Sequence, residues 1–353
     1  MSHTPLILFG AFDRHNLGDL LLAEIAAQAA APRPVLCTGL MARDMRAFGG
    51  RRVLALATVL AGWRERYGDA PPEIVQVGGE ILTTTAWEAL VMLQDAAGAE
   101  RLITVHDLCP EREAWARAQL GGVAPAPYVL ERDALRPPVR RLEFRGIGGV
   151  ALAHMPGELR EQVRRALAQA DAVSVRDTVT QAALATLGIA AALRPDPVCA
   201  WPAALAARAA RALGTPEVRA VRAAFPAGFI AVQFAAEHGS DAELDTLATM
   251  LKATGLPAVL MRAGAAPWHD DLAVYQRLTE RMQSPVRLFE ALDIWRIVAL
   301  LSHSAGVLAT SLHVRILARR YARPLLAAPD GWCSAKVRAY EASWNGSDRR
   351  PRR

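Results

Sequence analysis

Lysine is almost absent from this chain. Lys252 and Lys336 are the only lysines among 41 lysine and arginine residues, so arginine carries nearly all of the positive charge behind a formal net charge of +6. The planar arginine fork pairs with phosphate and carboxylate groups. The basic residues form neither a helix with regularly spaced positive charge nor an aromatic RNA-binding motif. The composition therefore favours small anionic substrates over nucleic acid.

Cysteine and long apolar runs are also scarce. The four cysteines lie far apart and form no CxxC pair, which excludes a disulfide framework and a zinc site of that type. No run stays apolar for the roughly 18 residues that a membrane span needs. The first apolar run, residues 6–12, lacks a basic segment before it, which is typical of a strand and not of a signal peptide. We expect a cytoplasmic protein with reduced cysteines.

What the chain does contain is enough apolar sequence for two cores. A chain of 353 residues with 52% hydrophobic residues exceeds what one core usually organises. Pro195 and Pro197 indicate a hinge near residue 200. We therefore predict an N-terminal Rossmann-like domain over residues 1–200, a C-terminal one over 201–345, and a basic tail over 346–353.

Short apolar runs alternate with helical stretches along both halves, which predicts parallel sheets covered by helices. In the first half the predicted strands cover residues 6–12, 34–38, 53–57, 74–77, 102–105 and 172–175. In the second half they cover residues 229–234, 258–262, 286–289, 306–310 and 324–327. The arginine-rich segment 132–145 is interpreted as a solvated loop and strand edge. The fold class predicted is α/β.

Ligands of open α/β sheets bind beyond the carboxyl ends of the strands, so the loops that follow strands hold the candidate residues. In the first loop, residues 10–19, a helix begins near Leu17. Its N-terminus suits an anion, but Asn16 or Asp19 is equally suited to capping that helix. Spacing alone does not separate the two interpretations.

Two further loops of the first half carry charge at a strand end. Gly78 and Gly79 let a ligand approach the backbone, with Glu80 beside them, although a simple tight turn has the same sequence. Arg176 is placed to clamp a carboxylate or phosphate. A structural pair between Arg176 and Asp177 is the commoner outcome for such neighbours.

The second half offers Arg262 at a strand end and His313 where residues 306–310 pass into a helix. A histidine at such a position can exchange a proton near neutral pH, and Arg315 follows two residues later. Residues 268–271 include a histidine and two aspartates, but adjacent acids at a helix start are usually caps. We therefore predict no metal site.

Taken in order, these motifs resemble the polysaccharide pyruvyl transferase family over nearly the whole chain. The motifs are Asn16-x-Gly18-Asp19, Gly78-Gly79-Glu80, Ser174-Val-Arg176-Asp177, Pro195-Asp196-Pro197, Thr310-Ser-Leu-His313 and Lys336. The resemblance implies a GT-B-like arrangement of the domains. It also implies transfer of a pyruvyl group from phosphoenolpyruvate, with no other cofactor, onto hydroxyls of a sugar or glycan acceptor to form a cyclic ketal.

On this resemblance, His313 is the acid/base residue and the arginines Arg176, Arg262 and Arg315 bind phosphoenolpyruvate. Asn16, Asp19 and Glu80 line the acceptor side. A lipid-linked acceptor would bring the protein to a membrane surface, and neither the acceptor nor the oligomeric state follows from the sequence.

The sequence departs from the family pattern at two places. Glu80 stands where many members have a third glycine, and Ser311 stands where many have an arginine. The second departure leaves the donor open, with Arg315 as a substitute for the lost arginine. The alternatives are a GT-B-type glycosyltransferase that uses a nucleotide sugar and a non-catalytic binding protein of the same fold.

Overall fold

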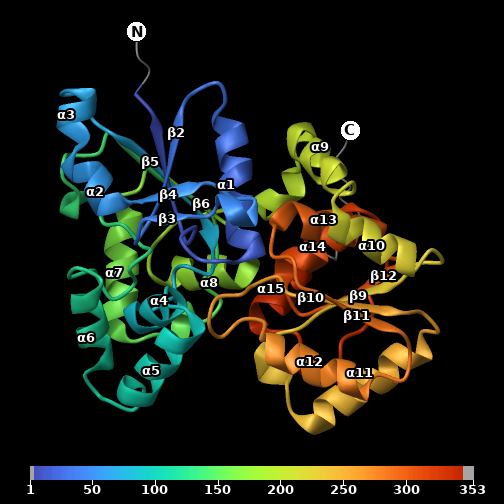
Figure 1. The fold of residues 1–353 in the computed structure, drawn as a ribbon. Helices are drawn as coiled ribbons and strands as arrows, with labels where there is room; N and C mark the ends of the chain where they lie inside the picture. Colours follow the sequence, from blue (N-terminus) through green and yellow to red (C-terminus); the bar gives the residue numbers. More distant parts are fainter. Residues whose placement is uncertain (1–3, 345–353) are drawn as a thin grey trace.

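The computed structural model describes residues 4–344, and the predicted basic tail lies outside the described residues. The chain forms two parallel-stranded sheets, each covered by helices, which Figure 1 shows side by side. The first sheet comes from the blue-to-green half of the chain and the second from the yellow-to-red half. The predicted α/β class with two Rossmann-like sheets is confirmed.

The first sheet has eight strands in the order β3-β4-β2-β1-β5-β6-β7-β8, all parallel except β3, which pairs antiparallel with β4. Its strands are β1 (Leu6–Phe9), β2 (Val35–Gly39), β3 (Arg43–Asp44), β4 (Arg52–Ala55), β5 (Glu73–Gly79), β6 (Arg141–Ile147), β7 (Ala172–Val175) and β8 (Ala192–Leu193). Its helices are α1 (Leu17–Ala30), α2 (Leu56–Ala61), α3 (Trp63–Tyr67), α4 (Ala86–Met92), α5 (Ala96–His106), α6 (Arg112–Gln119), α7 (Gly157–Ala168) and α8 (Thr178–Thr186).

The second sheet has four parallel strands in the order β11-β10-β9-β12. These strands are β9 (Ile230–Gln233), β10 (Ala258–Met261), β11 (Val286–Phe289) and β12 (Gly306–Ala309). The helices of this half are α9 (Ala203–Ala212), α10 (Pro216–Ala224), α11 (Asp241–Ala253), α12 (Leu272–Arg281), α13 (Ile294–His303), α14 (Leu312–Arg320) and α15 (Ala335–Trp344).

Two predicted strands were wrong. Residues 102–105 lie in α5, because Asp95 caps this helix by accepting a hydrogen bond from Gly98 N at 2.7 Å, and a four-residue apolar run suits either structure. Residues 324–327 form no strand, although Leu325 makes an isolated bridge to Val307. Part of the arginine-rich segment is strand β6, whose position between β5 and β7 makes it interior to the sheet.

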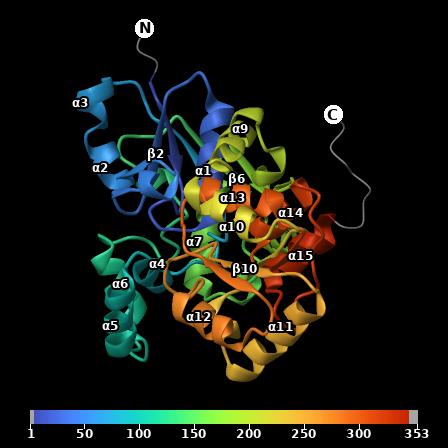
Figure 2. The ribbon, with the colours of Figure 1, turned by 45° about the vertical axis from the view of Figure 1, so that its right-hand side comes forward.

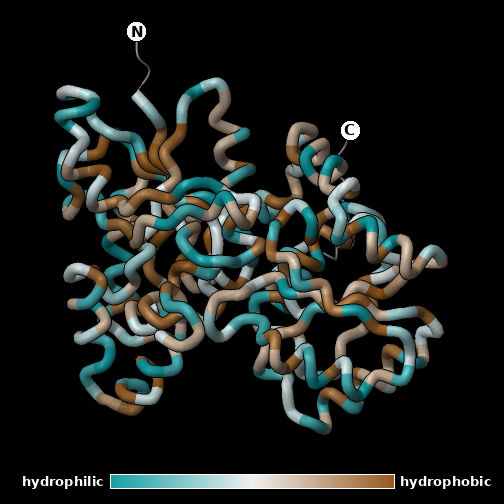
Figure 3. The backbone as a smooth tube through the Cα atoms, in the orientation of Figure 1, coloured by the Kyte–Doolittle hydropathy of each residue, from teal (hydrophilic) through white to brown (hydrophobic). Residues whose placement is uncertain are grey.

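Strands β1, β5, β9, β10 and β12 are buried along their whole length, and Figure 3 colours the hydrophobic residues of the chain brown. One continuous cluster of buried residues joins α1 to α13 and α14, so the two halves share a core across their seam. Helices α4, α5 and α6 enclose a small cluster of their own and project beside the first sheet (Figure 2). Within the described residues, no helix is both long and apolar enough to cross a membrane.

The last helix returns from the second half to the first. Helix α15 contacts α8, where Ser343 Oγ accepts a hydrogen bond from Thr178 N at 2.9 Å. Trp344 Nε1 donates to the carbonyl oxygen of Arg176 at 2.7 Å. The end of α15 therefore contacts the loop after β7 that carries Arg176.

Candidate active site between the two sheets

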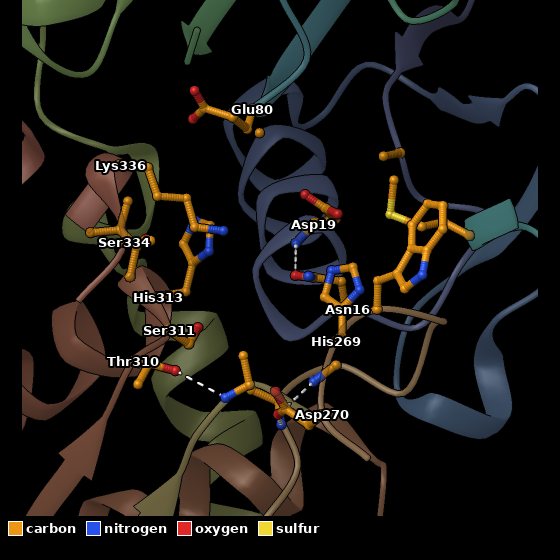
Figure 4. Close-up of a pocket in the computed structure, with 18 of the residues that line it drawn as sticks. Asn16, Asp19, Glu80, His269, Asp270, Thr310, Ser311, His313, Ser334 and Lys336 are labelled. Atoms are coloured by element: carbon orange, nitrogen blue, oxygen red, sulfur yellow. Dashed lines mark hydrogen bonds between the residues drawn. The ribbon is translucent and has the colours of Figure 1, made fainter. Parts of the chain in front are cut away.

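A cavity of about 330 Å³ lies between the two halves, at the carboxyl ends of β5, β9 and β12. The first half lines it with Asn16, Asp19, Gly79, Glu80 and Arg176, and the second with His269, Asp270, Ser311, His313 and Lys336. Figure 4 shows most of these side chains around one space. Seven of the sequence-predicted site residues therefore meet in one cavity: Asn16, Asp19, Gly79, Glu80, Arg176, His313 and Lys336.

A chain of charged groups crosses the seam beside this cavity. Arg176 donates from Nη2 to Glu80 at 2.7 Å and from Nη1 to Asp196 at 3.3 Å. Asp196 in turn has its Oδ2 3.3 Å from Nε2 of His313. Arg176 and Asp196 are almost fully buried, so their opposite charges hold each other in a low-dielectric setting. Glu80 and Asp196 thus orient Arg176, and Asp196 faces His313.

Asp196 is ionised in this setting. Burial alone would raise the pKa of its carboxyl, but the neighbouring His313 and Arg176 outweigh burial and lower that pKa to about 2. The carboxylate also accepts a hydrogen bond from Val198 N at 3.0 Å, because Asp196 caps the short helical turn Pro197–Ala200. A fixed negative charge therefore lies 3.3 Å from Nε2 of His313.

Gly18 gives His313 the room that it needs. Gly18 lies in the first turn of α1, and a Cβ atom there would overlap the imidazole ring. Gly18 is thus a packing partner of His313, while Gly78 packs on Leu22. Neither residue lines the cavity.

Helix α1 does not offer its N-terminus to an anion. Asn16 Oδ1 accepts from Gly18 N at 2.9 Å and from Asp19 N at 3.3 Å, and Leu17 N donates to Ala263 O at 2.7 Å. The capping interpretation of the first loop is therefore the correct one.

Helix α14, in contrast to α1, leaves the N–H groups at its N-terminus without partners among the described residues. Its N-cap residue, Ser311, makes no side-chain capping bond, and within residues 4–344 the first-turn N–H groups of Leu312, His313 and Val314 have no hydrogen-bond partner. The positive end of the helix dipole therefore faces the cavity that Ser311, Leu312 and His313 line. Such a helix end is a ready anion site.

Lys336 adds a positive charge at the same place. It is the second residue of α15, is exposed, and forms no ion pair with any described residue. Figure 4 shows Lys336 and Ser334 on the same side of the cavity as His313. An anion at the start of α14 would thus meet a free ammonium group.

The loop from β10 to α12 forms the other side of the cavity. Asp270 accepts from Ala263 N at 2.6 Å and Gly264 N at 3.2 Å through Oδ2, and from Gln233 Nε2 at 2.8 Å through Oδ1. Burial raises the pKa of Asp270 to about 7 against these hydrogen bonds. The same loop docks on the first half, where Ala265 N donates to His15 Nδ1 at 3.0 Å.

Two of the predicted arginines lie elsewhere. Arg315 donates from Nε to Glu341 Oε1 at 2.9 Å and from Nη1 to Ala309 O at 3.0 Å, so its guanidinium joins α14 to α15. Arg262 does not line the cavity either. Arg262 and Arg315 therefore do not join the other predicted site residues in this cavity.

The comparisons with known proteins agree with this architecture. The model of the polysaccharide pyruvyl transferase family matches residues 153–327. Over this segment the chain belongs to the polysaccharide pyruvyl transferase family. The matched segment contains Arg176, Asp196, His269 and His313. No curated protein sequence matches the chain.

Solved structures of similar fold cover nearly the whole chain. The chain is similar to UDP-N-acetylglucosamine 2-epimerase from Rickettsia bellii, with 10% identity, 97% of this chain and 88% of that chain covered, and a TM-score of 0.51. A second UDP-N-acetylglucosamine 2-epimerase gives 12% identity, 97% and 82% coverage, and a TM-score of 0.50. At such identities the likeness shows the fold alone, and it confirms the GT-B-like arrangement.

Sequence reasoning missed two cavity neighbours of this family member. The sequence names Asp196 only within the motif Pro195-Asp196-Pro197 and gives it no role, because its contacts with Arg176 and His313 come from the fold. Arg14 lines the cavity, is almost fully buried, and has no hydrogen-bond partner for Nε in the described part of the chain.

Proposed function

We propose that this protein transfers a pyruvyl group from phosphoenolpyruvate to two hydroxyls of a sugar or glycan acceptor, forming a cyclic ketal. The observation that carries the proposal is the uncapped start of α14, which shares one cavity with Lys336 and His313. Phosphoenolpyruvate brings a phosphate and a carboxylate, and this corner offers free N–H groups and a free ammonium group.

His313 supplies the proton in this mechanism. Attack of the first hydroxyl on C2 of phosphoenolpyruvate shifts the double-bond electrons to C3, which must then receive a proton. The Asp196 carboxylate, 3.3 Å from His313 Nε2, faces the imidazole that gives this proton. The second hydroxyl then displaces phosphate from C2, and its proton leaves with the phosphate.

Ser311 bears on the choice of donor. An arginine at this position would place a second cation beside the start of α14. Here Ser311 N instead donates to Gln233 Oε1 at 2.8 Å. Lys336 takes the role of the missing cation, and Arg176, held by Glu80 and Asp196, supports the site from the first half.

The test is the change in melting temperature on adding a ligand, because a ligand that binds only the folded protein raises it. We expect phosphoenolpyruvate to raise the melting temperature of the wild type and to act about 10-fold more weakly on Lys336→Ala, a loss of about 1.4 kcal/mol of binding free energy. Lys252→Ala is the matched control, since the only other lysine is exposed and donates to Gln283.

The alternatives give different results in the same assay. A rise with nucleotide sugars or nucleotide diphosphates alone would contradict the donor assignment and favour glycosyl transfer. No rise with any of these ligands would favour a binding protein that has kept only the fold.

A further inference from the structure

Trp268 is an exposed aromatic residue at the edge of the cavity. Its exposed fraction is 48%, and it lines the same cavity as His269 and Asp19. Its φ angle of 64° lies in the left-handed region, which a residue with a bulky side chain seldom adopts. An indole ring is therefore held partly in solvent, in an unfavourable backbone conformation, at the mouth of a polar site.

The surrounding loop imposes this conformation. On one side, Ala263 O accepts from Leu17 N at 2.7 Å and Ala265 N donates to His15 O at 3.2 Å. On the other side, Asp270 N donates to Gly264 O at 3.0 Å, which closes the loop on itself. Strain of this kind persists where surrounding contacts determine the conformation, and it gathers at functional sites.

His269, the next residue, presents an unprotonated nitrogen. Its Nδ1 lies 3.1 Å from the carbonyl oxygen of Pro267, and because a carbonyl only accepts, Nδ1 carries the ring hydrogen. Nε2 then has a free lone pair and makes no hydrogen bond within residues 4–344. The ring also packs on Gly264, where a Cβ atom would lie 2.7 Å from its Cδ2.

We propose that the loop of residues 263–271 is the acceptor subsite, where Trp268 stacks against the apolar face of a pyranose ring and His269 Nε2 accepts the proton of the attacking hydroxyl. This inference rests on the proposed pyruvyl transfer and assigns a second proton-transfer group to it. The hydroxyl oxygen bonds to C2, its proton moves to His269, and C3 receives its proton from His313.

The arrangement of the cavity fits this division. Figure 4 shows His313 and Lys336 on one side of the cavity and His269 on the other. The donor corner is cationic, whereas the loop offers an aromatic face and hydrogen-bond acceptors. An aromatic face with nearby acceptors suits a sugar, whose C–H face is apolar and whose hydroxyls donate.

The first experiment measures sugar binding without turnover. Saturation-transfer NMR with the methyl glycosides of glucose, galactose and mannose detects weak binding to the wild type, Trp268→Phe and Trp268→Ala. We expect at least one glycoside to bind the wild type, to bind Trp268→Phe within about threefold, and to bind Trp268→Ala at least 10-fold more weakly. Leu108→Ala, which removes an apolar side chain that is 95% exposed and outside the cavity, is the control.

The results separate the subsite from the proposed function. Equal binding to wild type and Trp268→Ala, or no glycoside binding by a wild type that responds to phosphoenolpyruvate, overturns the subsite and leaves the donor assignment intact. Glycoside binding that depends on Trp268 in a protein without any response to phosphoenolpyruvate supports the subsite and contradicts pyruvyl transfer.

The second experiment tests His269. Asparagine at this position keeps a donor for Pro267 O and removes Nε2. We expect His269→Asn to retain glycoside binding and to lose turnover at least 100-fold, because general-base catalysis contributes factors of about 10² to 10⁴. A loss below about 10-fold, or a parallel loss of glycoside binding, would overturn its role as the base.

Discussion

The imidazole of His313 packs directly against Gly18, so the first turn of α1 in one half fixes the position of the proposed acid/base residue in the other. A Cβ atom at position 18 would overlap the ring. The close approach needs the absence of a side chain, since Gly18 lies inside a helix, where glycine is otherwise unfavourable. The glycine of this motif is thus explained by packing across the seam.

We predict that Gly18→Ala lowers activity by displacing His313 from Asp196. Alanine favours the helix by about 1 kcal/mol, so the melting temperature should change little while turnover falls. Gly157→Ala is the matched control, because a Cβ atom at that helix position meets open space. Enzyme assays and thermal unfolding of both variants check the prediction, and unchanged turnover in Gly18→Ala would contradict it.

Removing the charge of Asp196 should destabilise the protein strongly. Asp196→Asn leaves Arg176 buried with only Glu80 as a carboxylate partner, and breaking a buried ion pair in this way costs about 3–5 kcal/mol. Because its neighbours lower the pKa of Asp196 to about 2, its contribution is complete above the unfolded value near 3.8 and is lost as the pH falls through 2. Denaturant unfolding at pH 7 and pH 3 should show a smaller difference between variant and wild type at pH 3.

Arg315 should matter for stability and not for the donor. Arg315→Ala leaves Glu341 with Arg319, whose Nη2 lies 2.6 Å from it. We expect a lower melting temperature and an unchanged rise on adding phosphoenolpyruvate. A thermal shift assay measures both quantities, and loss of the ligand response would return Arg315 to the site.

Mild acid should loosen the loop that carries His269. Burial, with Arg14 nearby, lowers the pKa of His269 to about 4, whereas the unfolded residue binds its proton near 6.5. The neutral ring therefore contributes stability above pH 6.5, and this contribution is lost as the pH falls toward 4. The free energy of unfolding should fall less steeply over this range in His269→Asn than in the wild type.

The alternation of short apolar runs and helical stretches predicted the two sheets, because the strands of a buried parallel sheet are short, continuous apolar runs. Six of the seven residues that meet in the cavity follow from the rule that such strand ends gather at one edge, whereas Lys336 lies in α15 and was expected from the family resemblance alone. The apolar pattern does not predict strand β6, because Arg141 and Arg145 place charge on it. In the structure these charges are paired with Glu143 of the same strand.

The arginines show where the sequence alone was insufficient. Arg315 lies two residues after His313 in α14, and side chains two residues apart in a helix point in different directions. Its actual partner, Glu341, comes from a helix that begins 20 residues later in the chain. Only the fold brings α14 and α15 together, so no local pattern distinguishes a substrate arginine from this structural one.

The central claim is tested most directly by following phosphoenolpyruvate labelled with ¹³C at C3 in the presence of the methyl glycosides and the purified protein. We predict that inorganic phosphate is released in equal amount to a new carbon-bound methyl group in a ketal, and that His313→Ala abolishes both signals. Phosphate release without a ketal, or consumption of a nucleotide sugar while phosphoenolpyruvate stays intact, would contradict the account.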